Sequence, residues 1–212
     1  MGIKFDDITD ESLGLNLISV NFGSPEPVLV KTEIPGRNGV LDQSEAIAGY
    51  ITYKEREVEL LFTLMADTEE EYASKIGAVR NALHGKKRKV ILSSDPDFYY
   101  ETRSLVEEAP ESSTFSEVTI TGTAYPYKRK TTDTVVEQTV TDTATEITCN
   151  NLAEPVIPTI ETSASMQIQF GGKTFNVQEG THTLDILFMA GENVLTVTGP
   201  GTIKITYREG SL

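Results

Sequence analysis

The sequence predicts a mainly β protein of two domains, with one α-helix in the first. Stretches with apolar residues at every second position recur along the chain, from residues 57–65 to residues 202–208. One stretch, residues 68–85, clearly carries helical spacing of apolar residues instead. The length of 212 residues is enough for two domains that each bury a core of their own.

The predicted helix has signals at both of its ends. Thr68 is a suitable N-cap residue, and Glu71 stands three residues later as its capping-box partner. Gly85 is typical of the position that follows a helix. The apolar residues between these signals recur at helical spacing: Tyr72, Ile76, Val79 and Leu83. We expect this apolar side to lie on a sheet.

The strands around the helix complete the first domain. In residues 57–65, four apolar side chains share one face: Val58, Leu60, Phe62 and Leu64. After the helix, residues 89–94 and 98–108 are predicted as strands around a turn at Asp95–Asp97, and residues 116–127 as another strand. These elements predict an N-terminal β-barrel-like or split β-sandwich domain with one α-helix.

The composition changes near Lys130. Residues 131–149 are rich in Thr and have no helical period, and we expect them to be weakly anchored and cut first by proteases. Short strands bounded by turn residues then follow at nearly regular spacing, among them residues 182–188, "HTLDILF". This pattern predicts a β-sandwich or a jelly roll. The predicted domains are therefore residues 1–130 and 131–212.

Composition and charge exclude several classes of function. A formal charge of −14 repels phosphate backbones and anionic lipids, so it disfavours binding to nucleic acids and membranes. The chain has no apolar run of the length that a membrane helix requires, and its first residues lack the pattern of a signal peptide. We expect synthesis and residence in the cytoplasm. Cys149 is the only cysteine, so an intrachain disulfide is impossible.

Candidate catalytic groups are few. The two histidines, His84 and His182, have no catalytic partner nearby in the sequence, and His84 is interpreted as a solvated cation at a helix end. Asp95 and Asp97 lack the spacing of a calcium loop, and no phosphate-binding glycine motif occurs. We predict no catalytic, cofactor-binding or metal-binding residues. Half-buried packing is the expected role of the strand tyrosines, although they could also bind sugar: Tyr50, Tyr53, Tyr99, Tyr100, Tyr125 and Tyr127.

The order of the motifs resembles one known family. Residues 35–39, "PGRNG", are followed by a strand of the type seen at residues 56–64, by the helix ending at Gly85, and by the stretch "DPDFYYETR" at residues 95–103. This order is similar to that of distal tail proteins of siphophages. The second half, with "FGGKTFNV" and "NVLTVTGPGTIKITYR", is similar to the galectin-like C-terminal β-sandwich of that family.

The resemblance implies a structural protein and not an enzyme. Members form a homohexameric ring at the tip of the tail tube, between the tail tube protein and the tail-associated hub protein that leads to the receptor-binding apparatus. The implied location is the tail of a phage or prophage particle, made in the bacterial cytoplasm. No cofactor is implied, and DNA passes through the channel without being bound specifically.

The "PGRNG" turn carries the only site residues that we predict. Pro35-Gly36 and Asn38-Gly39 are two adjacent turn signals, and a turn that only reverses the chain is the simplest interpretation. If the loop lies at the contact between ring protomers, Arg37 and Asn38 would hydrogen-bond a neighbour. Independently of this contact, the resemblance implies that the first domain closes the ring, and we expect an acidic channel wall that repels DNA phosphates. The candidate acids of this domain are Asp42, Glu45, Glu55, Glu57 and Glu59.

Two other classes of function stay open at this point. The C-terminal β-sandwich could be a lectin-like carbohydrate-binding module in host cell-wall adhesion, although galectin-type sites use Trp and His and this chain has no Trp. A glycosidase with two carboxylates is the other alternative, because acidic residues are abundant.

Overall fold

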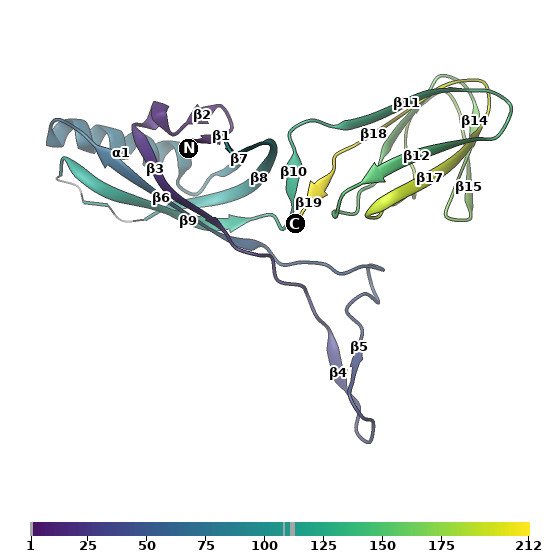
Figure 1. Cartoon of the computed structure of the whole chain (residues 1–212), viewed down its shortest axis with the longest axis horizontal. Helices are drawn as coiled ribbons and strands as arrows, with labels where there is room; N and C mark the ends of the chain where they lie inside the picture. The colour runs from purple at the N-terminus through teal and green to yellow at the C-terminus, as the bar shows by residue number, and fades with distance from the viewer. Residues whose placement is uncertain (1, 108, 111–112) are drawn as a thin grey trace. The chain divides into compact units, whose positions relative to one another are not determined.

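The computed structural model describes residues 2–107, 109–110 and 113–212. The chain divides into two compact units, Met1–Pro126 and Tyr127–Leu212 (Figure 1). The predicted mainly β fold is confirmed, and α1 (Glu69–Leu83) is the one α-helix among the described residues. The division falls before Lys130, because β10 (Lys128–Lys130) pairs with β19 (Gly210–Ser211) inside the second unit.

One curved antiparallel sheet forms the first unit (Figure 1). Its main path runs in the order β2-β1-β7-β8-β9-β6-β3, so β2 and β3 are its edges. The bounds are β1 (Ile3–Phe5), β2 (Ile8–Thr9), β3 (Leu15–Phe22), β6 (Arg56–Met65), β7 (Lys87–Leu92), β8 (Asp95–Val106) and β9 (Phe115–Ala124). A 3-10 turn, η1 (Glu11–Leu13), precedes β3.

Helix α1 packs against β6 and β8 and covers one face of this sheet. The predicted alternation in β6 is confirmed, because Val58, Leu60, Phe62 and Leu64 are all buried in the core. The helix contributes Tyr72, Ile76, Val79 and Leu83 to the same core. The buried Tyr72 hydroxyl also lies 2.5 Å from the Ser116 hydroxyl, which ties the helix to β9.

The N-terminal end of the helix follows the prediction in part. The Thr68 side chain accepts the Glu71 main-chain N–H at 3.1 Å, which confirms the N-cap. The Glu71 carboxylate accepts the N–H of Asp67 at 2.9 Å, one residue earlier than a capping box requires. Both bonds still satisfy main-chain donors at the start of the helix.

Two strand-level predictions are wrong. Asp95–Asp97 belong to β8 and form no turn, because Leu92 pairs with Asp95 and leaves Ser93 and Ser94 as the hairpin turn. Residues 184–188 were expected to continue a strand, but β16 (Gly180–Thr183) ends before them. Within that segment, Phe188 pairs with Val156 only in an isolated bridge.

The second unit is the predicted β-sandwich of two four-stranded antiparallel sheets. One sheet has the order β11-β18-β13-β16 and the other the order β12-β17-β14-β15. Their further bounds are β11 (Thr134–Val140), β12 (Thr145–Asn151), β13 (Thr159–Thr162), β14 (Met166–Phe170), β15 (Lys173–Val177), β17 (Gly191–Thr198) and β18 (Gly201–Tyr207). Residues of both sheets form its core, including Ile147, Ile168 and Ile205.

The Thr-rich segment is therefore not the weakly anchored connection that we expected. Most of residues 131–149 belongs to β11 and β12, which pair with β18 and β17 respectively. Val140 and Ile147 from this segment are buried in the core of the second unit. Threonine is common in strands, so its abundance here reflects sheet formation.

Candidate assembly interface

A long excursion of the first unit, which we call the arm, connects β3 to β6. The arm comprises residues 24–55, and its outer part is a hairpin of β4 (Lys31–Glu33) and β5 (Val40–Asp42) that stands away from the main sheet (Figure 1). The base of the arm is closed by main-chain hydrogen bonds from Val28 to Thr52 and from Lys54 to Glu26, each 2.8 Å long.

The arm has no buried residue, although its sequence is not especially polar. Five large apolar side chains are exposed along it: Leu29, Val30, Ile34, Val40 and Ile47. The side chain of Ile47 is 100% exposed. Apolar side chains scattered singly are normal on a surface, but five within one extension that lacks a core indicate a surface that another molecule covers.

The hairpin has one apolar face. Thr32 pairs with Leu41 across the two strands, and alternation places Val30 and Ile34 on the same side. The opposite side carries charges, because Lys31 pairs with Asp42 and Glu33 pairs with Val40. A two-stranded hairpin is only marginally stable in water on its own. Its apolar face therefore needs a partner surface to be held firmly.

The predicted site residues lie together at the tip of this hairpin. Arg37 and Asn38 are both exposed in the turn between β4 and β5. The turn is formed as expected, since Gly36 and Gly39 have φ values of 83° and 77°, and the Arg37 N–H donates to the Ile34 carbonyl at 3.1 Å. The structure thus presents both polar side chains at the outermost point of the arm.

The predicted acidic residues separate into two groups. Asp42, Glu45 and Glu55 belong to the arm, where hydrogen bonds from the Ser44 side chain and main chain lower the pKa of Asp42. Glu57 and Glu59 are exposed on β6, on the side opposite to the buried Val58 and Leu60. We call this side of β6 and β9 the open face.

The open face is mostly polar and acidic. Its cross-strand pairs are Glu57 with Thr123, Glu59 with Thr121, Leu61 with Thr119, Thr63 with Glu117, and Met65 with Phe115. Three carboxylates and four threonine hydroxyls therefore line two adjacent central strands. Apolar side chains concentrate at one end, where Met65 and Phe115 are both more than half exposed.

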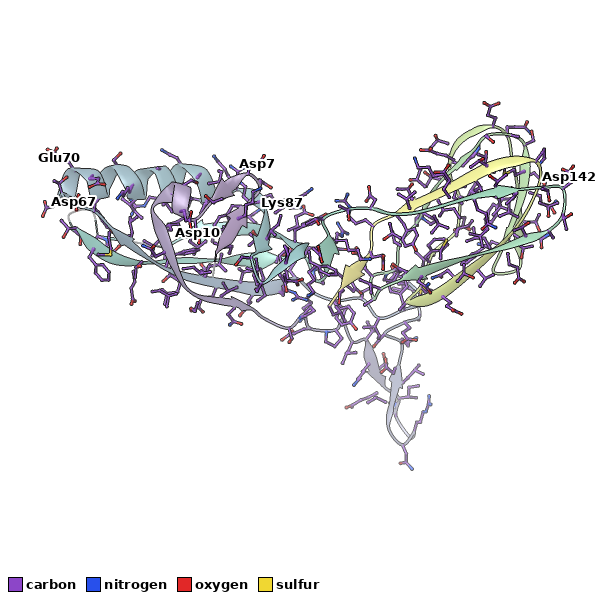
Figure 2. The ribbon with its side chains drawn as sticks, turned by 45° about the horizontal axis from the view of Figure 1, so that its top comes forward. Asp7, Asp10, Asp67, Glu70, Lys87 and Asp142 are labelled. Atoms are coloured by element: carbon purple, nitrogen blue, oxygen red, sulfur yellow. The ribbon has the colours of Figure 1, made fainter. Side chains whose placement is uncertain are left out.

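The side chains of the basic cluster at residues 86–89 bind main-chain carbonyls at the C-terminal end of helix α1 and acidic groups close to it. Lys86 donates to the main-chain oxygen of Asn81 at 2.5 Å, and Arg88 to that of Ala82 at 3.0 Å. Lys87 pairs with Glu101 at 2.6 Å. Figure 2 shows Asp67 and Glu70 at the start of the helix and Lys87 near its other end, which is the arrangement that complements the helix dipole.

The histidines and the cysteine are not arranged for catalysis. His84 is exposed at the end of helix α1, and its Nδ1 accepts the N–H of Val106 at 3.2 Å. The Nε2 atom of His182 lies 2.8 Å from the Gln178 carbonyl. Cys149 is buried, and burial raises its pKa to about 11. Within the described ranges, no cluster of His, Cys, Asp and Glu could hold a metal ion.

The described part of the chain also contains no helix that is long and apolar enough to cross a membrane. The tyrosines that were considered for sugar binding are largely packed. Tyr99 and Tyr127 are buried, and the ring of Tyr100 stacks on Phe22 with centroids 3.8 Å apart.

Comparison with known proteins identifies the class of this fold. The family model of the phage tail protein RIFT-related domain matches residues 7–121, which is more than half of the chain. The chain therefore belongs to this family of phage tail proteins. No curated protein sequence matches the chain.

A solved structure is similar over both units. It is the crystal structure of the Dit protein of phage SPP1, described as a paradigm of the hub adsorption apparatus in phages that infect Gram-positive bacteria. The TM-score is 0.71 with 18% identity, and the match covers 98% of each chain. The resemblance to siphophage distal tail proteins is confirmed, and the protein is a structural component of the phage tail. The alternative of a carbohydrate-binding module is not favoured by these matches.

Sequence reasoning missed most of the arm. It identified the tip through the turn residues, but it did not identify the exposed Ile47 or the apolar face around Leu41. The available signal was the presence of apolar residues on both sides of the turn, in strands too short to show alternation.

Proposed function

We propose that the protein forms a homohexameric ring at the distal end of the phage tail tube. The ring connects the tail tube protein to the hub protein and to the receptor-binding apparatus beyond it. The first unit, Met1–Pro126, forms the ring, and the second unit, Tyr127–Leu212, is a galectin-like β-sandwich. The protein acts by assembly and not by catalysis.

The observation that carries this proposal is the arm. An extension of 32 residues without a buried side chain, but with an apolar hairpin face, has no reason to remain exposed in a finished particle. In a ring every protomer has an identical neighbour, so each arm can be covered by the next protomer in a contact that repeats until the ring closes.

Arg37 and Asn38 then serve as the polar contacts at the end of each arm. An arginine fork and an asparagine amide provide directional hydrogen bonds, which fix the register of an otherwise apolar contact. The apolar hairpin face supplies the buried area, and the tip determines where the arm ends on the neighbour.

The open face is suited to the wall of the ring channel. Its carboxylates repel DNA phosphates, and its threonines are polar without being basic. DNA can therefore pass along such a wall without being held. The acids that matter for this role are Glu57, Glu59 and Glu117, whereas Asp42 and Glu45 belong to the arm.

The test is the mass of the protein in solution, measured by light scattering and native mass spectrometry over a range of concentrations. We expect a hexamer, and electron micrographs should show rings. Substitution Arg37→Glu should lower the population of hexamer, and replacement of residues 29–51 by a two-residue turn should abolish it. An arm-shortened chain that still forms rings would refute the assembly role of the arm.

Electron micrographs of the whole particle test the location. An antibody against the second unit should label the tail tip. Label along the tube or at the head would exclude the proposed position.

A further inference from the structure

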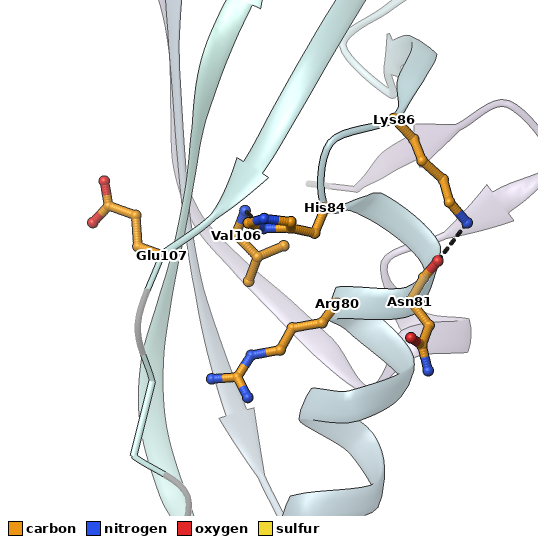
Figure 3. Close-up of a pocket in the computed structure, with 6 residues that line it drawn as sticks. All are labelled: Arg80, Asn81, His84, Lys86, Val106 and Glu107. Carbon is orange, nitrogen blue, oxygen red and sulfur yellow. Dashed lines mark hydrogen bonds between the residues drawn. The ribbon is translucent and has the colours of Figure 1, made fainter.

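A hollow of about 610 Å³ lies at the C-terminal end of helix α1. Six residues line it: Arg80, Asn81, His84, Lys86, Val106 and Glu107 (Figure 3). They come from the last turn of the helix, the connection to β7, and the end of β8. None of the contacts described so far assigns a role to this hollow.

The cations of the hollow have no carboxylate partner. Arg80 donates to the Ala109 carbonyl at 3.4 Å, and Lys86 donates to the Asn81 carbonyl at 2.5 Å. Among the described residues, neither cation forms an ion pair, whereas Lys87 and Arg88 close by are paired with Glu101 and Asp6. These main-chain bonds orient the cationic groups but leave their charge unneutralised, in a chain whose net charge is −14.

The other polar groups favour the same kind of ligand. His84 accepts the Val106 N–H through Nδ1 at 3.2 Å, so Nε2 is the ring nitrogen that is left for a ligand. Figure 3 shows the His84 ring beside Val106, the Arg80 side chain below it, the Lys86 side chain reaching toward Asn81, and the Glu107 side chain turned away from Arg80. The hollow therefore offers two cations, Arg80 and Lys86, and buried Val106 is its apolar floor. A carboxylate with an adjacent apolar side chain matches it.

The arm provides such a pair of side chains. Residues 43–49 form a compact turn, which we call the knuckle, closed by hydrogen bonds from Ala46 to the Gln43 carbonyl and from Gly49 to the Glu45 carbonyl. The knuckle presents the exposed carboxylate of Glu45 and the fully exposed side chain of Ile47. Because Ile47 is 100% exposed, the knuckle does not occupy the hollow of its own chain.

We propose that the knuckle of one copy docks into the helix-end hollow of the neighbouring copy. Glu45 meets Arg80 and Lys86, and Ile47 packs on Val106 and on the aliphatic stems of the two cations. Charge pairs that are removed from water at an interface determine register strongly, and an inserted apolar anchor supplies contact area. This inference rests on the proposed assembly of identical copies and specifies where the arm lands.

A charge swap tests the landing site with the full-length chain. Glu45→Lys and Arg80→Glu should each weaken assembly about tenfold or more, the size expected for a close interfacial charge pair. The double variant should recover most of this loss, because the pair is restored with opposite polarity. Ile47→Ser should weaken assembly without changing its dependence on salt, whereas the charge variants should reduce that dependence.

The control is Glu33→Lys, an exposed acid of the arm outside the knuckle, combined with Arg80→Glu. This combination should show no recovery. If the double variant with Glu45→Lys and Arg80→Glu assembles as weakly as the added losses of the two single variants predict, the proposed landing site is wrong. If arm-shortened chains lose assembly while the swap fails, only this site is refuted and the proposed function stands. A wild-type chain that stays monomeric up to millimolar concentration would refute both.

Discussion

The hydroxyl of Tyr207 donates to the main-chain oxygen of Asn150 at 2.6 Å inside the second unit. The phenol is buried, and its ring meets Phe188 edge to face with centroids 5.2 Å apart. Burial raises the pKa of Tyr207 to about 12, with a further contribution from Cys149 and Glu209. The folded unit therefore favours the neutral phenol.

This shift predicts loss of stability at high pH. The unfolded chain ionises Tyr207 near its ordinary pKa of 10, whereas the folded unit does so only near 12. The stabilisation is complete below about pH 10 and is lost as the pH rises through 12, by on the order of 2 to 3 kcal/mol. Urea unfolding from pH 8 to 12 should show this decline in the free energy of unfolding. The Tyr207→Phe substitution should remove the share of the decline that ionisation of the phenol causes. An equal pH slope in both proteins would contradict the assignment.

The Tyr207→Phe variant should also be less stable at neutral pH. It leaves the Asn150 carbonyl without its hydroxyl donor, which costs about 1 to 2 kcal/mol. The two chains should therefore converge in stability as the pH rises. Cys149 titrates in the same pH range and contributes to the shift of Tyr207, so both proteins are compared in a Cys149→Ala background.

Cys149 should be chemically inert in the folded protein. It is fully buried, and burial raises its pKa to about 11, so the thiolate that reacts with alkylating reagents is scarce at neutral pH. We expect negligible labelling in native buffer and complete labelling in denaturant, so that labelling follows unfolding of the second unit. Cys149→Ala with Thr143→Cys, at an exposed position, provides a control that should react at once. Fast labelling of the native wild-type chain would refute the burial.

Two glycines of the first unit should respond to alanine in opposite ways. A Cβ at Gly122 would lie 2.1 Å from the main-chain oxygen of Arg103, so Gly122→Ala must separate β8 from β9. We expect a loss of about 2 kcal/mol or more. At Gly77, on helix α1, no atom lies within 4 Å of an added Cβ, so Gly77→Ala should gain about 0.5 to 1 kcal/mol.

Urea unfolding followed by circular dichroism and tyrosine fluorescence measures both changes. A Gly122→Ala chain as stable as the wild type would show that the two strands are not as close as described.

The parts of the fold that the sequence predicted well are those with their partners in the same unit. Thr68 and the spacing from Tyr72 to Leu83 defined the helix, because its cap and its core contacts are local and periodic. The alternation of β6 was visible because one face is buried and the other is not. In both cases the side chains that pack into the core of the same chain are apolar at regular intervals, and this spacing predicts the helix or the strand.

The errors arose where one residue type is compatible with two structures. Asp95-Pro96-Asp97 has the composition of a turn, but register places the turn at Ser93 and Ser94, and the strand begins at Asp95. Proline is tolerated at a strand start, so composition alone could not decide. The arm was missed for a different reason. Its apolar residues contact nothing within the chain, so no intrachain pattern marks them.

The acidic open face makes a prediction about DNA. Assembled wild-type protein should show no measurable affinity for duplex DNA even at low salt, where screening is weakest. Glu57→Lys with Glu59→Lys reverses two charges on β6 of the open face, and in a ring this change is repeated in every protomer around the channel. The assembled variant should bind DNA, with an affinity that falls steeply as salt is added, because lysines that neutralise phosphates release counterions.

The control is Glu146→Lys with Glu192→Lys, an equal charge change at exposed positions of β12 and β17 in the second unit. If both double variants bind DNA equally, net charge alone decides and the open face is not the channel wall. If the wild-type ring itself binds DNA in a salt-dependent manner, the proposed passage of DNA without retention is wrong.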